Sequence, residues 1–196
     1  MYQSWFETER LVIREYTKKD LDGFLRVVRQ PEIRATTYGI PDNYSRWRAK
    51  WWMRIIRQNR SLQTAYEYGV FLRENGLYIG NTGLINMDSY HYHADITYYI
   101  DREQMNRGYA TEAAAAMIQY GFEDLGFHKI NGVCMSVNGA SRRVMEKLGM
   151  TYEGTLRQDL LKNGIYYDLD RLSLLKDEYY TNCKVENPGF QHLNVE

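Results

Sequence analysis

The sequence predicts an α+β fold in which a mixed, mostly antiparallel twisted sheet carries a central βαβ crossover and flanking helices. Two observations support this prediction. First, segments with strand periodicity and segments with helical apolar spacing follow one another in the order strand, two helices, three strands, helix, strand, helix and two strands. Second, the central strand–helix–strand step requires a parallel crossover, whereas the turn at Asn163-Gly164 requires antiparallel pairing.

Length and composition limit the class of protein. With 196 residues the chain is long enough for one hydrophobic core and short for two, so we expect one domain over residues 1–180 and a loose tail over 181–196. The 25 basic and 25 acidic residues cancel, which argues against a surface that attracts nucleic acid or membrane as a whole. Two cysteines, no signal-peptide pattern and no run of roughly 20 apolar residues predict a cytoplasmic protein without a membrane segment.

The first half of the chain holds two expected helices and four expected strands. Ser45 is a candidate N-cap for a basic helix over 46–59, in which Trp47, Trp51 and Ile55 recur four residues apart. We expect this aromatic stripe to pack on the sheet and to leave the basic side chains in solvent. The other expected elements are a strand at 11–16, a helix from Thr17 that Pro31 closes, a hairpin of strands 68–73 and 78–86, and a strand at 94–101.

The second half repeats a strand-to-helix design. An alanine-rich helix is expected over 111–125, where Gly126 ends it, and a second, shorter helix begins near Asn138. The expected strands lie at 129–136, 150–161 and 165–175. Periodicity is lost after Asp177, which predicts the loose tail.

A glycine turn joins the strand at 94–101 to the alanine-rich helix at 111–125. Gly108 permits backbone angles that other residues avoid and leaves no side chain between the amides and a ligand. The helix that starts there directs free N–H groups and the positive end of its dipole at the same place, which favours an anion. By itself this turn does not identify a ligand, because glycine is common in purely structural turns.

Several further motifs occur in order after this turn, and together they resemble the GNAT superfamily of acetyltransferases. The motifs are Arg107-Gly108-Tyr109-Ala110-Thr111-Glu112, His128-Lys129-Ile130, Asn138-Gly139-Ala140-Ser141, Glu146-Lys147-Leu148-Gly149-Met150 and Glu153-Gly154-Thr155-Leu156-Arg157. Together with the opening Glu7-Thr8-Glu9-Arg10-Leu11, they are similar to the RimJ/RimL-type branch, which acetylates the N-termini of ribosomal proteins. The likeness covers roughly residues 7–180.

The resemblance implies a GNAT-like fold and acetyl-CoA as the donor, held in a V-shaped gap between two strands. It places the pyrophosphate on the amides of the glycine turn, the pantetheine arm on Asn138, and an oxyanion hole on backbone N–H groups of the splayed strand. The implied cofactor-binding residues are Tyr99, Ile100, Asp101, Asn106, Arg107, Gly108, Tyr109, Ala110, Thr111 and Asn138. The superfamily pattern has Gln or Arg where this chain has Met105, and Gln104 and Arg107 are the nearest substitutes.

Two catalytic candidates follow from the same resemblance. Asp95 stands on the strand at 94–101, where related enzymes often carry a glutamate base, and its shorter side chain favours a relay water. The tyrosine that commonly protonates the CoA thiolate is replaced by Met145, so Ser141 is the best remaining proton donor. The alternatives stay open that Asp95 is a solvated strand carboxylate and that Ser141 only caps a helix.

The expected activity is acetyl transfer to a primary amine by direct attack in a ternary complex, with a protein N-terminal α-amine as the preferred acceptor. Three alternatives remain: acetylation of a small-molecule amine, a non-catalytic acyl-CoA sensor, and an RNA- or nucleoprotein-binding module on the basic helix. No metal site is expected, because His91, His93 and Asp95 lack a further ligand cluster. The further expected partners are a second copy of the chain, in a homodimer, and nucleic acid through an indirect contact.

Overall fold

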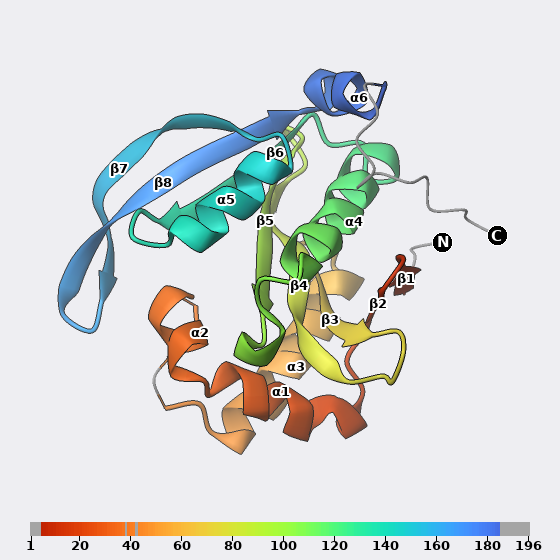
Figure 1. Cartoon of the computed structure of the whole chain (residues 1–196), viewed down its shortest axis with the longest axis vertical. Helices are drawn as coiled ribbons and strands as arrows, with labels where there is room; N and C mark the ends of the chain where they lie inside the picture. Colours follow the sequence, from red (N-terminus) through yellow and green to blue (C-terminus); the bar gives the residue numbers. More distant parts are fainter. Residues whose placement is uncertain (1–4, 38, 42, 185–196) are drawn as a thin grey trace.

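A computed structural model describes residues 5–37, 39–41 and 43–184. The described residues form one eight-stranded sheet of order β1-β2-β3-β4-β5-β6-β8-β7 (Figure 1). Every neighbouring pair is antiparallel except β5 and β6, which the chain joins through a helix. The predicted mixed sheet with a central βαβ crossover and flanking helices is therefore confirmed.

The elements follow the predicted order with small shifts at their ends. The strands are β1 (Trp5–Glu7), β2 (Leu11–Arg14), β3 (Tyr66–Leu72), β4 (Tyr78–Asp88), β5 (His93–Ile100), β6 (Lys129–Met135), β7 (Thr151–Lys162) and β8 (Ile165–Leu175). The α-helices are α1 (Leu21–Val28), α2 (Pro31–Thr36), α3 (Arg46–Ser61), α4 (Tyr109–Glu123), α5 (Gly139–Lys147) and α6 (Lys176–Lys184). Short 3-10 turns, Lys18–Asp20 and Arg102–Gln104, precede α1 and follow β5.

Helices cover both faces of the sheet. On one face, the alanines of α4 let that helix approach β4 and β5 closely, and Met145 of α5 packs in the same cluster. On the other face, α1 and α3 build a second cluster around Phe24, Tyr78 and Tyr99. Because each face is buried, strand β5 carries apolar side chains on both sides, and Tyr99 belongs to the second cluster rather than to a wet polar face.

The parallel pairing of β5 with β6 is short, and its early end creates a gap in the sheet. The two strands pair from His93↔Lys129 to Ile96↔Gly132, and beyond that point β6 pairs with β8 alone. Backbone groups of β5 from Thr97 onward thus have no strand partner on this side. This is the place where the sequence predicted a V-shaped opening.

Three segments differ from the sequence prediction. Pro31 does not close the first helix but begins α2 at its N1 position, where a missing N–H costs nothing. The short edge strand β1 was missed, since three residues are too few for a periodic signal. Helix α6 makes residues 181–184 helical where a loose tail was expected, while the remainder of that tail lies outside the described residues.

The packing face of α3 is also different from the one predicted. Trp47 and Trp51 are 71% and 50% exposed, whereas Ala49 and Ile56 are buried and Trp52 packs against their cluster. Both stripes recur at helical spacing, so periodicity alone could not select between them. The predicted N-cap is present, because Ser45 Oγ accepts a hydrogen bond from the Arg48 amide at 3.1 Å.

This packing predicts unequal effects of two truncations on α3. Replacing the buried Ile56 with alanine should lower the free energy of unfolding by about 2–5 kcal/mol through lost contacts and a cavity. Replacing the exposed Trp47 with alanine should change it by less than about 0.5 kcal/mol. Urea denaturation of both variants measures the difference, and a larger loss for Trp47→Ala would contradict the observed orientation of α3.

Candidate active site

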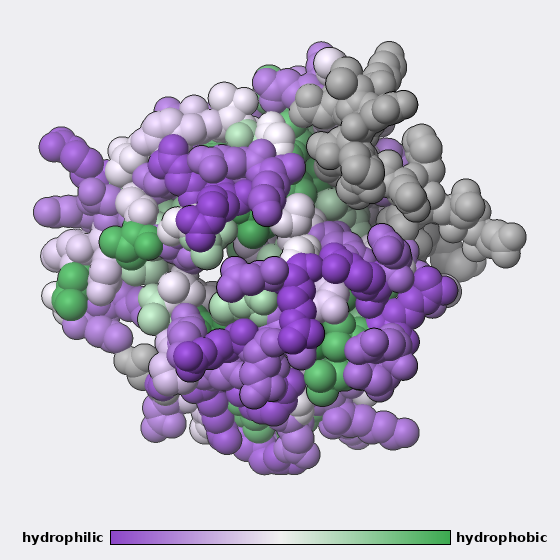
Figure 2. All heavy atoms as spheres, in the orientation of Figure 1, coloured by the Kyte–Doolittle hydropathy of each residue, from purple (hydrophilic) through white to green (hydrophobic). Residues whose placement is uncertain are grey.

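One pocket of about 480 Å³ runs through the gap between β5 and β6. Ten of the twelve side chains predicted to bind or react line it: Asp95, Tyr99, Ile100, Asn106, Gly108, Tyr109, Ala110, Thr111, Asn138 and Ser141. Figure 2 shows pale and green, more hydrophobic residues in a hollow between α2 and α5, with hydrophilic residues around it. The lining comes from both faces of the sheet, so the pocket connects the α4–α5 side with the α1–α2 side.

The anion-binding turn has the geometry that the sequence predicted. Gly108 is the N-cap of α4 with φ +83°, a left-handed conformation, and Asn106 also has positive φ at 61°. The first amides of α4 have no partner inside the helix and face the pocket end that Ala110 and Thr111 line. This end of the pocket is therefore suited to a pyrophosphate.

A clasp from the N-terminal strand holds this turn in place. The Arg10 guanidinium donates to Glu112 Oε2 through Nε at 2.7 Å and to the Arg107 carbonyl through Nη1 at 2.9 Å. The Arg10 amide and the Thr8 hydroxyl both donate to Glu112 Oε1. Glu112 thus orients the helix start, and the Arg107 carbonyl is engaged on the side of the N-terminal strand.

Within the described part of the chain, Asp101 and Arg107 are the two predicted residues that do not line the pocket. Arg107 contributes its carbonyl to the clasp. Asp101 is buried with 1% exposure, and its carboxylate forms an ion pair with Arg26 and accepts a hydrogen bond from Gln30 Nε2 at 2.8 Å. The Asp101 side chain therefore ties the end of β5 to helix α1 and the start of α2.

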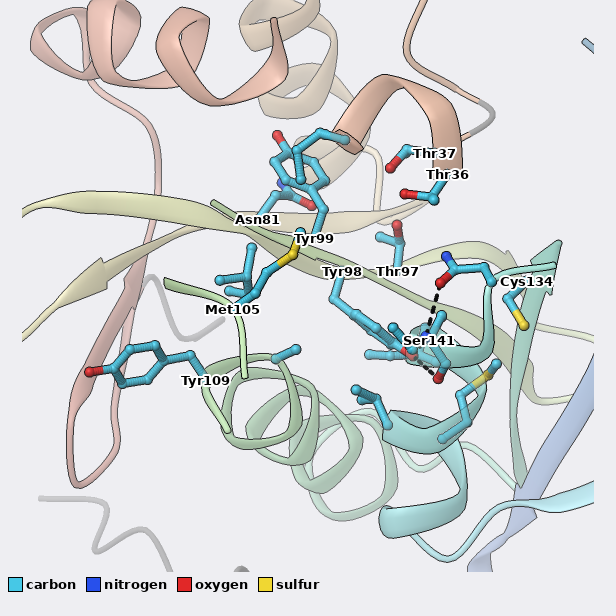
Figure 3. Close-up of a pocket in the computed structure, with 18 of the residues that line it drawn as sticks. Thr36, Thr37, Asn81, Thr97, Tyr98, Tyr99, Met105, Tyr109, Cys134 and Ser141 are labelled. Carbon is cyan, nitrogen blue, oxygen red and sulfur yellow. Dashed lines mark hydrogen bonds between the residues drawn. The ribbon is translucent and has the colours of Figure 1, made fainter. Parts of the chain in front are cut away.

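Ser141 lies in the middle of the pocket, next to a tyrosine that the sequence analysis overlooked. Tyr98 Oη lies 3.0 Å from Ser141 Oγ and donates to the Ser141 carbonyl at 3.0 Å (Figure 3). The Ser141 amide donates to Asn138 Oδ1 at 3.1 Å, so Asn138 caps α5 and leaves the serine hydroxyl free of that role. Tyr98 was overlooked because the alternation of β5 marked it only as a core position.

Asp95 lies where β5 and β6 are still paired, at the closed end of the gap. Its two carboxylate oxygens accept hydrogen bonds from Asn131 Nδ2 at 3.1 Å and Asn86 Nδ2 at 2.9 Å. Asp95 lines the pocket, but both of its oxygens already have an amide donor. The residue predicted as the base thus lines the pocket, and each of its carboxylate oxygens already accepts one hydrogen bond.

A second carboxyl group on the same wall was not identified from the sequence. Glu67 on β3 lines the pocket, and burial raises the pKa of its carboxyl to about 7. Gln104 also lines the pocket. It is one of the two nearest substitutes for the Gln or Arg that the superfamily pattern has in place of Met105. A single acid within a strand has no local signature, and only the pairing of β3 with β4 brings Glu67 to this wall.

The rim of the pocket on the α1–α2 side is joined to the β7–β8 hairpin. Lys162 Nζ donates to the carbonyls of Arg34 and Thr37 at 2.5 Å and 2.8 Å, at the end of α2. Thr36, Thr37 and Gly39 line the pocket directly beside this contact. The end of α2 and the β7–β8 hairpin thus meet at one rim of the pocket.

Within the described ranges, no group of three or more His, Cys, Asp or Glu side chains is arranged to hold a metal ion. Over the same ranges, no helix combines the length and apolar character that crossing a membrane requires.

The decisive comparison is with families of known proteins. Residues 10–151 match the acetyltransferase (GNAT) domain. The chain belongs to this family. It is 29% identical to the uncharacterized N-acetyltransferase YoaA of Bacillus subtilis over 87% of this chain and 96% of that protein. It is 28% identical to the spermidine N(1)-acetyltransferase of Escherichia coli over 56% of this chain and 58% of that protein.

Solved structures agree with this assignment at the level of the fold. The chain superposes with a TM-score of 0.81 on RimL, the ribosomal L7/L12 alpha-N-protein acetyltransferase solved in complex with coenzyme A. The match covers 89% of this chain and 99% of RimL at 16% identity. The predicted membership of the GNAT family and the predicted donor, acetyl-CoA, are confirmed, and RimL resembles the chain in its fold.

The glycine turn of this GNAT enzyme provides a direct test of cofactor binding. Gly108→Ala should weaken acetyl-CoA binding at least tenfold, because an alanine at φ +83° is strained by roughly 1–2 kcal/mol and the turn relaxes by moving its amides. Gly126→Ala is a matched control, since Gly126 has φ +72° with open space around it and lies after α4. Both variants should lose similar stability, and calorimetric titration should show weaker binding for Gly108→Ala alone. Equal affinities would contradict a role of this turn.

Proposed function

We propose that the enzyme acetylates a protein N-terminal α-amine by direct attack of the amine on acetyl-CoA in a ternary complex. The observation that carries this proposal is the single pocket that connects the α4 turn with the α1–α2 face through the gap beside Ser141. The donor would enter from the α4–α5 side and the acceptor from the other. The amine of the acceptor then reaches the thioester carbon of the donor while both substrates are bound in the same pocket.

The cysteine of the pocket argues for direct attack. Cys134 lines the pocket near Ser141, and burial raises the pKa of its thiol to about 11. Near neutral pH the group is a protonated thiol and a poor nucleophile, because the thiolate is the reactive form. An acetyl-cysteine intermediate is therefore disfavoured relative to a ternary complex.

The charges of the pocket favour an acceptor with a single amine. Among the described lining residues, the acids Glu67 and Asp95 are matched in number by the bases Arg143 and Lys147. A polyamine carries several positive charges and needs an excess of carboxylates. An α-amine carries one charge and titrates near 8, so a good part of it is neutral and nucleophilic at physiological pH.

Ser141 is suited to protonate the departing CoA thiolate. As the amine nitrogen bonds to the thioester carbon, the C–S bond breaks and the sulfur takes the electron pair. The Ser141 hydroxyl can give its proton to that sulfur and regain one from solvent, while Tyr98 Oη, 3.0 Å away, holds the serine oxygen in place. Free N–H groups on β5 beyond Ile96 can stabilise the oxyanion that precedes C–S cleavage.

A small polyamine is the second candidate acceptor. It is favoured by the placement of two carboxyl groups, Glu67 and Asp95, on the same wall of the pocket, and by the relative in Escherichia coli that is named a spermidine acetyltransferase.

A cytoplasmic location and a homodimer stay predictions from the sequence.

An acceptor panel separates the candidate functions. Thiol release from acetyl-CoA should be fastest with peptides that carry a free N-terminus, and weak with spermidine and with peptides whose only amine is a lysine side chain. Spermidine as the best acceptor would select the polyamine candidate. Binding of acetyl-CoA without thiol release from any acceptor would leave only the sensor, and tight, salt-sensitive RNA binding would favour the nucleoprotein module.

The role of Ser141 can be tested with two variants. Ser141→Ala should lower kcat roughly 100-fold, because it removes the general acid, while the Kd for acetyl-CoA changes less than about threefold. Tyr98→Phe keeps the serine and removes the neighbouring hydroxyl, so its kcat should fall less. The rate of CoA thiol release at saturating substrate gives kcat. An unchanged kcat in Ser141→Ala would show that the serine serves only the helix cap.

A further inference from the structure

We propose that Glu67 is the general base that accepts the proton of the acceptor amine, in place of the strand carboxylate Asp95. The inference rests on the proposed acetyl transfer to an amine and names a residue of that same pocket.

The register places Glu67 in line with the open part of the gap. Glu67 on β3 pairs with Gly83 on β4, and Gly83 pairs with Thr97 on β5. Thr97 is the first residue of β5 after the last pair with β6, Ile96↔Gly132. The row of Glu67, Gly83 and Thr97 therefore leads from β3 directly to the point where the strands separate.

The Glu67 side chain runs along this row toward the gap. A Cβ atom built on Gly83 would lie 3.0 Å from Glu67 Cγ, so the glutamate stem occupies the space that any larger residue at position 83 would fill. Glu67 and Thr97 both line the pocket. Gly83 thus serves as a passage by which a carboxyl from a more distant strand reaches the acceptor side of the gap.

Glu67 is also less engaged than Asp95. Both oxygens of Asp95 accept from asparagine amides, whereas the Glu67 carboxyl has no hydrogen-bond or ion-pair partner within the described residues. Burial holds the Glu67 pKa near 7, so the group can take up a proton near neutral pH and release it again. A base with an ordinary carboxyl pKa would be weaker by comparison.

The groups around Glu67 do not supply a strong counter-charge. Arg60, from the helix above, is paired with Glu15. The titratable and charged groups that face Glu67 from the neighbouring elements are Glu15 and Tyr16 after β2, Tyr44 before α3, Arg57 and Arg60 on α3, and Asp95 and Tyr99 on β5. Burial is the cause of the raised Glu67 pKa.

The neutral amine nitrogen attacks the thioester carbon, and the C–N bond forms as the C–S bond breaks. The extra N–H proton passes to the Glu67 carboxylate, directly or through one water, and the CoA sulfur receives a proton from Ser141. Glu67 then releases its proton to solvent and Ser141 takes one up from solvent, which restores both groups and leaves an acetamide and CoA thiol.

The test is the pH dependence of kcat/KM for the best acceptor of the panel, measured on wild type, Glu67→Gln and the matched control Asp95→Asn. Wild type should lose activity as pH falls through about 7, because the base becomes protonated. Glu67→Gln should lower kcat/KM about 100-fold and lose this acidic limb. Asp95→Asn should keep this acidic limb at the same pH, whatever its effect on the size of kcat/KM.

Two further measurements keep the outcomes distinct. Glu67→Gln should bind acetyl-CoA with the wild-type Kd, and it should not be less stable than wild type at pH 8, because the raised pKa opposes the charged form in the folded state. If wild type turns over but Glu67→Gln keeps the acidic limb of the pH profile, the assignment of Glu67 as the base is wrong. The same conclusion follows if Asp95→Asn loses that limb. Either result leaves the proposed function intact. Wild type that releases no CoA with any acceptor overturns the proposed function and this inference together.

Discussion

The early end of the β5–β6 pairing is the constraint on which the rest of the site depends. Four residue pairs, from His93↔Lys129 to Ile96↔Gly132, hold the two strands in parallel before they separate. Beyond them β6 is committed to β8, and β5 is left with free backbone groups on one side. An opening in the middle of a sheet is unusual because buried backbone groups must be paired, so it is tolerated where a ligand completes the pairing.

The elements around the opening divide the work between its two ends. In the proposed function the start of α4 offers amides to the phosphate at one end, and the Arg10–Glu112 clasp fixes that start against the N-terminal strand. Ser141 and Tyr98 meet at the middle, where the proposal places the thioester. The α2 end and Lys162 close the acceptor side. A donor and an acceptor can therefore approach the same carbon from opposite faces of the sheet.

Local signals in the sequence predicted most of the fold and the cofactor half of the site. Glycines, caps and alternation located β8 and α5 almost to the residue, because each of these features acts within a few positions along the chain. Ordered motifs located Gly108, Asn138 and Ser141 in one pocket. The exposed Trp47 shows the limit, since two stripes on α3 had the same period and only tertiary packing selected the other.

The acceptor half depended on contacts that no local pattern records. Glu67 reaches the pocket because β3 pairs with β4 at a glycine, and Tyr98 meets Ser141 across 43 positions of sequence. Such pairs become visible only when strand register is known. Differences between relatives that carry the same cofactor turn are accordingly expected on this side of the sheet, where the acceptor is chosen.

Hydrogen–deuterium exchange with and without acetyl-CoA tests the central claim, that the cofactor completes the opening between β5 and β6, most directly. Acetyl-CoA should slow the exchange of amides at 106–111, in β5 beyond Ile96 and at the start of α5, and should leave α3 and the β7–β8 turn unchanged. Protection that is absent from these segments, or that is centred on α3, would contradict a cofactor site in the gap.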